Sequence, residues 1–294
     1  MRSFSLAVLF LTFLLSSASA ADDPFAPLLN ALPRTADSVF CFDPAALSSL
    51  PGVLMPRRGG NLSGVSDSLA DWSGGSFRPS AAAFFFRGED VGLLLRGTLT
   101  PEGFSAAAEK HAAERTERNG RTCFLLGDGD GPKILLAFLP DHVLMLAEQK
   151  TAEHFLAAPA GASEEVRSAL ALLPRGGMTL SGVCLPSGAL ASQPGWSDIA
   201  RIAFSVSVPG DDRLPVVSDV LLFPRKPSLA GSVYDTARKQ VGSAYEAARK
   251  KGPVRPEMLY AFLVTPGAGY TKIHITLTRP DARDFLELVQ SYWR

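Results

Sequence analysis

The side chains that most often carry catalysis or bind metals are scattered along the 294 residues of this sequence. The histidines are His111, His142, His154 and His274, and none is followed four residues later by a second one. Asp141 and His142 are adjacent, but the pattern around them is typical of a hairpin turn. Because a catalytic metal needs three or four converging ligands, we predict no metal site and no cofactor.

The three cysteines, Cys41, Cys123 and Cys184, each lie in an apolar run typical of a strand. This context favours small buried side chains, and one disulfide or one reactive thiol are the alternatives. The Gly-Asp stretch at 127–132 lacks the later carboxylates of a calcium loop. No Gly-x-Ser-x-Gly nucleophile elbow occurs either, and we predict no catalytic residue.

The first twenty residues have the pattern of a signal peptide. Arg2 precedes an apolar run at 6–15, and small residues at 18–20 precede a cleavage point. The run is shorter than the roughly 20 apolar residues that span a bilayer, although an uncleaved N-terminal anchor is the alternative. We predict cleavage after Ala20, a periplasmic or secreted location, and no transmembrane span once the signal is removed.

Composition narrows the class of protein. The 29 basic and 29 acidic side chains balance to a net charge of zero, which argues against a nucleic-acid binder. Hydrophobic residues make up 46% of the chain, enough for a packed core, so disorder is not expected. The length after the signal suits one large or two small domains.

Two halves of the sequence resemble each other in the order of their strand-like runs. LPRTADSVFC at 32–41 is close to LPRGGMTLSGVC at 173–184, and AFFFRGED at 83–90 is close to AFSVSVPGDD at 203–212. The spacing between matched runs changes only in stretches rich in Gly, Ser and Pro, as insertions in loops produce. We therefore predict a duplication, which divides the chain into a signal peptide at 1–20, a first repeat at 21–173 and a second repeat at 174–294.

A helix is expected after the first hairpin of each repeat. Residues 101–119 begin with a proline and an acid and stop before Gly120. Residues 228–251 carry apolar side chains at a spacing of three to four. Packing on a sheet is favoured over a membrane-surface helix, because the apolar face is rich in Ala and Gly. These elements predict an α+β fold of two pseudo-repeated antiparallel sheets, each with helices packed on one face, loosely ferredoxin-like.

Several short motifs resemble those of a known group. A strand ends at Arg96-Gly97, a helix follows with Phe104 near its start, and a hairpin comes later at 135–146. This pattern resembles a loose group of exported bacterial proteins of unknown function with duplicated α+β units. The resemblance covers about residues 83–158 and more faintly 200–292. It implies a fold and supplies no catalytic residues.

The first repeat has an additional stretch within 51–80, and loops carry function more readily than cores. Arg57, Arg58 and Trp72 in this stretch combine two cations with an aromatic side chain, a set suited to binding a protein partner. We predict a partner-binding loop formed by these three residues. An insertion without a role is the alternative.

The regular elements lack converging polar side chains, which predicts a non-enzymatic binding or scaffold module outside the cytoplasm. Its expected partner is another extracytoplasmic protein. The alternative function is an extracytoplasmic hydrolase, because corresponding turns of the two repeats carry paired acids. These acids are Glu89-Asp90 and Asp211-Asp212.

Overall fold

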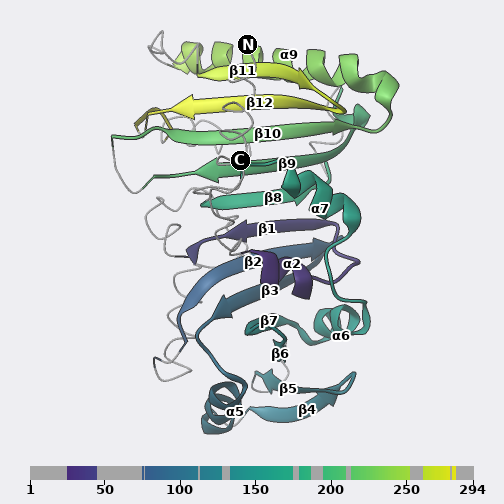
Figure 1. Ribbon diagram of the computed structural model, residues 1–294, viewed down its shortest axis with the longest axis vertical. Coiled ribbons are helices and arrows are strands. Elements are labelled where there is room, and N and C mark those ends of the chain that lie inside the picture. The colour runs from purple at the N-terminus through teal and green to yellow at the C-terminus, as the bar shows by residue number, and fades with distance from the viewer. Residues whose placement is uncertain are drawn as a thin grey trace, which may run out of the picture.

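The protein has an α+β fold built on one large antiparallel sheet (Figure 1). The computed structural model describes residues 25–44, 75, 77–111, 113–127, 133–174, 179–186, 195–209, 213–251, 261–278 and 280–282. The strands of the first half are β1 (Ser38–Phe42), β2 (Pro79–Arg87), β3 (Asp90–Gly97), β4 (Glu114–Arg118), β5 (Arg121–Leu126), β6 (Ile134–Leu139) and β7 (Val143–Glu148). Those of the second half are β8 (Leu180–Cys184), β9 (Ile199–Ser207), β10 (Val216–Pro224), β11 (Phe262–Gly267) and β12 (Tyr270–Leu277).

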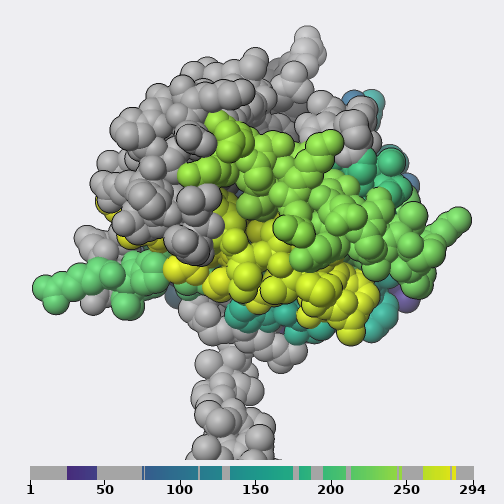
Figure 2. Space-filling model, turned by 90° about the horizontal axis from the view of Figure 1, so that it is seen from above, coloured from purple at the N-terminus to yellow at the C-terminus, as the bar shows by residue number. Residues whose placement is uncertain are grey.

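Five helices of the described residues accompany the sheet. They are α2 (Ala26–Ala31), α5 (Pro101–Lys110), α6 (Gln149–Ala157), α7 (Glu164–Ala171) and α9 (Ala230–Lys251), with short 3-10 turns at Trp196–Asp198 and Pro227–Leu229. The expected helix at 228–251 is confirmed as α9. Figure 2, seen from above, shows α9 in green beside the yellow strands β11 and β12.

The two pseudo-repeated sheets that the sequence predicts are instead one sheet, because β1 and β8 join all twelve described strands. The order across it is β11-β12-β10-β9-β8-β1-β2-β3-β7-β6-β5-β4. At the centre β1 pairs antiparallel with β8, Cys41 opposite Ser181. Both strands are largely buried, so their pairing satisfies backbone groups that two separate sheet edges would leave without partners.

The prediction that helices pack on one face only is wrong, because helices cover both faces of the sheet. Face A is packed against α2, α6 and α7, and its core includes Val39, Leu94 and Met145. Face B carries α5 over the first half and α9 over the second. Side-chain caps mark the starts of α5 and α7. At α5, for example, the Thr100 hydroxyl accepts a hydrogen bond from the Gly103 amide at 3.2 Å, and a proline follows at the first helical position.

The expected helix at 101–119 is too long. α5 ends at Lys110, and the charged strand β4 follows, paired with β5 through Arg118 opposite Arg121. Gly120 does not end a helix. Asn119 and Gly120 have φ values of 51° and 72° and form the two-residue turn between β4 and β5. Asn-Gly is the preferred sequence for this turn, because both central residues need positive φ.

Two glycine substitutions are expected to change stability in opposite directions. Gly120→Ala places a Cβ on a residue at φ +72°, which lowers the free energy of unfolding by about 1 kcal/mol. Gly242→Ala adds a good helix former to α9, where no atom lies within 4 Å of the new Cβ, and raises that free energy by about 0.5–1 kcal/mol. Urea denaturation of both variants measures the two effects. A change in the free energy of unfolding with the same sign in both variants would contradict the assignment of Gly120 to a turn.

Candidate binding pocket

A cavity of about 110 Å³ lies on face A, where the C-terminal ends of α2 and α6 meet the turn between β6 and β7. Its floor is apolar and consists of Leu139, Met145 and Phe155, all at most 7% exposed. Phe155 is fixed by an edge-to-face contact with Phe85, with ring centroids 4.5 Å apart. The cavity is therefore set into the main core.

One wall is formed by the segment after α6, which pairs with the end of α2. The Gly161 amide donates to the Leu32 carbonyl at 2.8 Å, and the Arg34 amide donates to the Pro159 carbonyl at 2.9 Å. Pro33 and Ala160 form an antiparallel bridge between the two segments and line the cavity. These backbone bonds hold the wall, and the Arg167 guanidinium adds hydrogen bonds to the Ala162 carbonyl at 3.2 Å and the Leu29 carbonyl at 3.3 Å.

The opposite side of the mouth is the turn between β6 and β7. Asp141 and His142 have φ values of 59° and 58°, and the Val143 amide donates to the Pro140 carbonyl at 3.3 Å. The prediction that Asp141-His142 occupies a hairpin turn is confirmed. His142 Nδ1 lies 3.3 Å from the Leu99 carbonyl, whereas Asp141 is exposed and lines the cavity.

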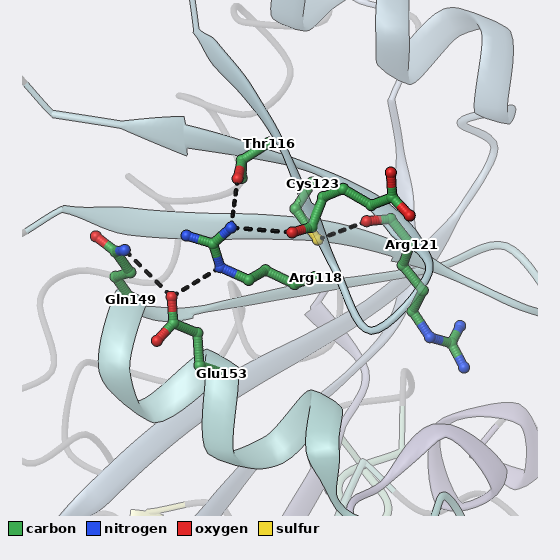
Figure 3. Close-up of polar contacts among 7 residues, drawn as sticks. Thr116, Arg118, Arg121, Cys123, Gln149 and Glu153 are labelled. Carbon is green, nitrogen blue, oxygen red and sulfur yellow. Dashed lines mark hydrogen bonds and ion pairs between the residues drawn. The ribbon is translucent and has the colours of Figure 1, made fainter.

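Arg121 supplies a cation to the same mouth. It begins β5, and its side chain extends away from the neighbouring Arg118–Glu153 pair (Figure 3). Within the part of the chain that the structure describes, neither the Arg121 guanidinium nor the Asp141 carboxylate has a hydrogen-bond or ion-pair partner. The mouth of the cavity therefore presents a cation and an anion that are not paired with each other.

A polar network beside the cavity attaches α6 to the sheet (Figure 3). Arg118 Nε donates to Glu153 Oε1 at 2.8 Å, and Gln149 Nε2 donates to the same oxygen at 3.2 Å. Arg118 also donates to the Thr116 hydroxyl at 2.6 Å. The hydrogen bond from Arg118 lowers the pKa of Glu153. This network fixes the orientation of α6, whose last turn borders the cavity.

The cysteines are unbridged, so the alternative of one disulfide is wrong. Cys41 and Cys123 are buried, and all three are among the described residues. Burial raises the pKa of the Cys123 thiol, and the nearby Arg118 guanidinium offsets only part of this. Burial also raises the pKa of Cys184 to about 11. Both effects favour the inert thiol over the reactive one.

We expect Cys123 and Cys184 to resist alkylation in the folded protein. At pH 7.5 the raised pKa values leave few thiolates, and burial limits access. Iodoacetamide labelling followed by mass spectrometry should therefore modify both residues slowly in buffer and rapidly in guanidinium chloride. Fast labelling of Cys123 under native conditions would show that it is an activated thiol.

A second polar cluster joins β10 to β12 on face A. Asp219 has a side chain only 4% exposed, and its Oδ1 lies 2.9 Å from Lys272 Nζ and 2.7 Å from His274 Nδ1. His274 Nε2 lies 3.1 Å from the Thr276 hydroxyl. Burial raises the pKa of Asp219, but hydrogen bonds from His274 and Lys272 outweigh it, so the carboxyl pKa is lowered. Asp219 is therefore an ionised group inside the sheet.

Sequence reasoning missed this cluster, because Asp219 and His274 are 55 residues apart and meet only through strand register. They belong to one row of side chains that crosses all twelve described strands on face A. In the first half the row is apolar from β5 to β1, and in the second half it becomes polar. Its members are Thr116, Cys123, Ala137, Met145, Leu94, Ala83, Cys41, Ser181, Ser205, Asp219, His274 and Leu263.

The Thr276 hydroxyl, the His274 imidazole and the Asp219 carboxylate follow one another in the order found in nucleophilic hydrolases. Two observations favour a structural role instead. Lys272 shares the Asp219 oxygen that would orient the imidazole. Thr276 is exposed and does not line the cavity, and its amide already donates to the Ala261 carbonyl at 2.9 Å, so this amide does not serve as an oxyanion donor.

The residues predicted from sequence lie elsewhere. Arg57, Arg58 and Trp72 fall outside the described residues, as does Asp211-Asp212. Glu89 is exposed at the turn between β2 and β3, and the Asp90 carboxylate accepts a hydrogen bond from the Thr151 hydroxyl at 3.0 Å. The described residues contain no group of three or more His, Cys, Asp or Glu arranged to hold a metal ion.

Comparisons with known proteins add little. No protein-family model and no curated protein matches this chain. A solved structure entitled "Structure of crystal form I of TP0453" matches with a TM-score of 0.45 and 10% sequence identity, covering 88% of this chain and 96% of that one. At this level the likeness carries no functional inference. In the described residues, the helices are too short or too polar to cross a membrane.

Proposed function

We propose that this chain is an exported, non-enzymatic binding module and that the cavity between α2, α6 and the turn of β6 and β7 is its binding site. The carrying observation is the combination of an apolar floor with a cation and an anion at one mouth, neither of which has a partner among the described residues. Ligand sites are typically concave and apolar with few placed polar groups. An apolar group that fills such a site gains from the removal of its own surface and that of the floor from water.

We also propose that the fold arose by duplication and that the protein is exported. Counted outward from the central pair, β1-β2-β3-β7-β6 and β8-β9-β10-β12-β11 follow the same order. This order supports a duplication, with β4 and β5 added to the first copy. Export rests on the signal-peptide pattern of the first twenty residues.

The hydrolase alternative gains no support from the acids that are described. Asp90 uses its carboxylate to attach the start of α6 to β3 through Thr151. The predicted partner-binding loop is a separate proposal. It is tested by capturing partners from a periplasmic extract with a variant that carries alanine at Arg57, Arg58 and Trp72, because an unchanged set of captured proteins would contradict a role for the loop.

Blocking the cavity tests the proposed site. Saturation-transfer NMR with the neutral probe 3-methyl-1-butanol should show binding to the wild type. Ala158→Trp, which fills a position that lines the cavity, should abolish it. The matched control is Ala157→Trp on the adjacent exposed residue, which does not line the cavity and should leave binding intact. Equal binding by both variants, or no binding by the wild type, would overturn the proposal.

A further inference from the structure

We infer that the cavity takes a zwitterionic α-amino acid with an aliphatic side chain, or a group of the same chemistry. This inference rests on the proposed function, since it assigns a ligand class to that site. The observation behind it is the pairing of opposite charges around one apolar space. Arg121 and Asp141 both line the cavity, and within the described chain neither has another partner.

The two charges match the two ends of the ligand head group. A guanidinium binds a carboxylate through two parallel hydrogen bonds, so Arg121 is the partner for the α-carboxylate. Asp141 accepts hydrogen bonds only and is the partner for the α-ammonium. The last turn of α6 also borders the cavity, and the carbonyl end of a helix favours a nearby cation.

The volume of the cavity limits which ligand side chain can enter it. Apolar cavities of roughly 150 Å³ lined by similar residues admit benzene. A cavity of about 110 Å³ is smaller and suits a branched aliphatic group such as the leucine side chain. The floor of Leu139, Met145 and Phe155 offers no hydrogen-bond donor from its side chains, so an aliphatic side chain suits the floor better than a polar one.

Isothermal titration calorimetry with three matched probes tests the inference. The probes are L-leucine, 4-methylpentanoate, which lacks the ammonium, and 3-methylbutylamine, which lacks the carboxylate. L-leucine should bind at least about tenfold more tightly than either analogue, since each analogue leaves one charge without its partner.

Single substitutions test which charged residue binds which end of the ligand. Arg121→Gln should weaken L-leucine and 4-methylpentanoate alike, by about tenfold or more. Asp141→Asn should weaken L-leucine but leave 4-methylpentanoate unchanged, and asparagine tolerates the positive φ of this position. Arg115→Gln, on the exposed strand β4 and outside the cavity, is the control and should change nothing.

The outcomes separate the two proposals. Equal affinity for the three probes, or affinities insensitive to Arg121→Gln and Asp141→Asn, would overturn the zwitterion inference. If 3-methyl-1-butanol still binds and Ala158→Trp blocks it, the binding pocket itself stands. If neither the neutral probe nor L-leucine binds, both proposals fail.

Discussion

Phe104→Ala is expected to lower the free energy of unfolding by about 3–4 kcal/mol. Phe104 is 2% exposed and packs from α5 onto face B of the sheet. Its ring lies 5.3 Å from that of Phe124 in an edge-to-face arrangement and 5.6 Å from that of Phe138. Truncation removes both aromatic contacts and leaves a void that rigid strands cannot close, so the loss exceeds simple transfer of the side chain to water.

Guanidinium chloride unfolding followed by circular dichroism measures this loss. Phe104→Leu, which keeps most of the volume, should cost far less. Glu109→Ala on the exposed side of the same helix should change stability by less than about 0.5 kcal/mol. Because Phe104 and the cavity lie on opposite faces of the sheet, folded Phe104→Ala should still bind ligands of the cavity. A loss below about 1 kcal/mol would contradict the packing described for α5.

Asp219→Ala is expected to lower the free energy of unfolding by about 2 kcal/mol. The buried carboxylate holds Lys272 of β12 at 2.9 Å and His274 of β12 at 2.7 Å. Their side chains are 35% and 38% exposed, so both can regain water when the carboxylate is removed. The expected loss therefore lies below that of a fully buried ion pair.

Glu246→Ala, an exposed acid on α9, is the matched control for removing one negative charge. It should leave stability within about 0.5 kcal/mol of the wild type. A triple variant that makes Asp219, Lys272 and His274 all apolar should recover part of the loss, because it leaves no charge without a partner. If Asp219→Ala were as stable as Glu246→Ala, the cluster would have no structural role.

The contribution of Asp219 should depend on pH with a defined sign. Its pKa is lowered in the folded protein by His274 and Lys272, whereas an unfolded aspartate has a pKa of about 3.9. A lowered folded pKa means that the stabilisation is fully present above about pH 4 and disappears as the pH falls through the folded value. The stability difference between wild type and Asp219→Asn should therefore shrink from pH 5 to pH 2. A difference that grows towards pH 2 would contradict the assignment.

Local sequence signals predicted most strands but not how they join. The hairpins of β2 with β3 and of β6 with β7 follow from strand-like runs separated by short turns. Pairing between β1 and β8 depends on a contact between residues about 140 apart, and nothing local specifies it. The error at α5 has a local cause. Helix propensity in 111–118 is acceptable, but the Asn119-Gly120 turn and pairing with β5 override it.

The candidate site could be predicted only in fragments. The pattern around Asp141-His142 predicts a hairpin turn, and the apolar run around Cys123 indicates the strand that Arg121 begins. Their shared position at one cavity depends on the register of β5 with β6 and on the packing of α2 and α6, which no residue spacing reveals. The cluster at Asp219 is hidden for the same reason, although a charged residue in the middle of an apolar strand is itself a sign of a buried partner.

The most direct test of the binding site is the NMR signal of the Met145 methyl group, which lies in the cavity floor and is 1% exposed. With methyl-labelled protein, titration of 3-methyl-1-butanol or L-leucine should shift the Met145 signal saturably. The methyl signals of Val233, which is buried where α9 packs on face B, should not move. A Met145 signal that stays fixed in folded protein at saturating probe would contradict the account.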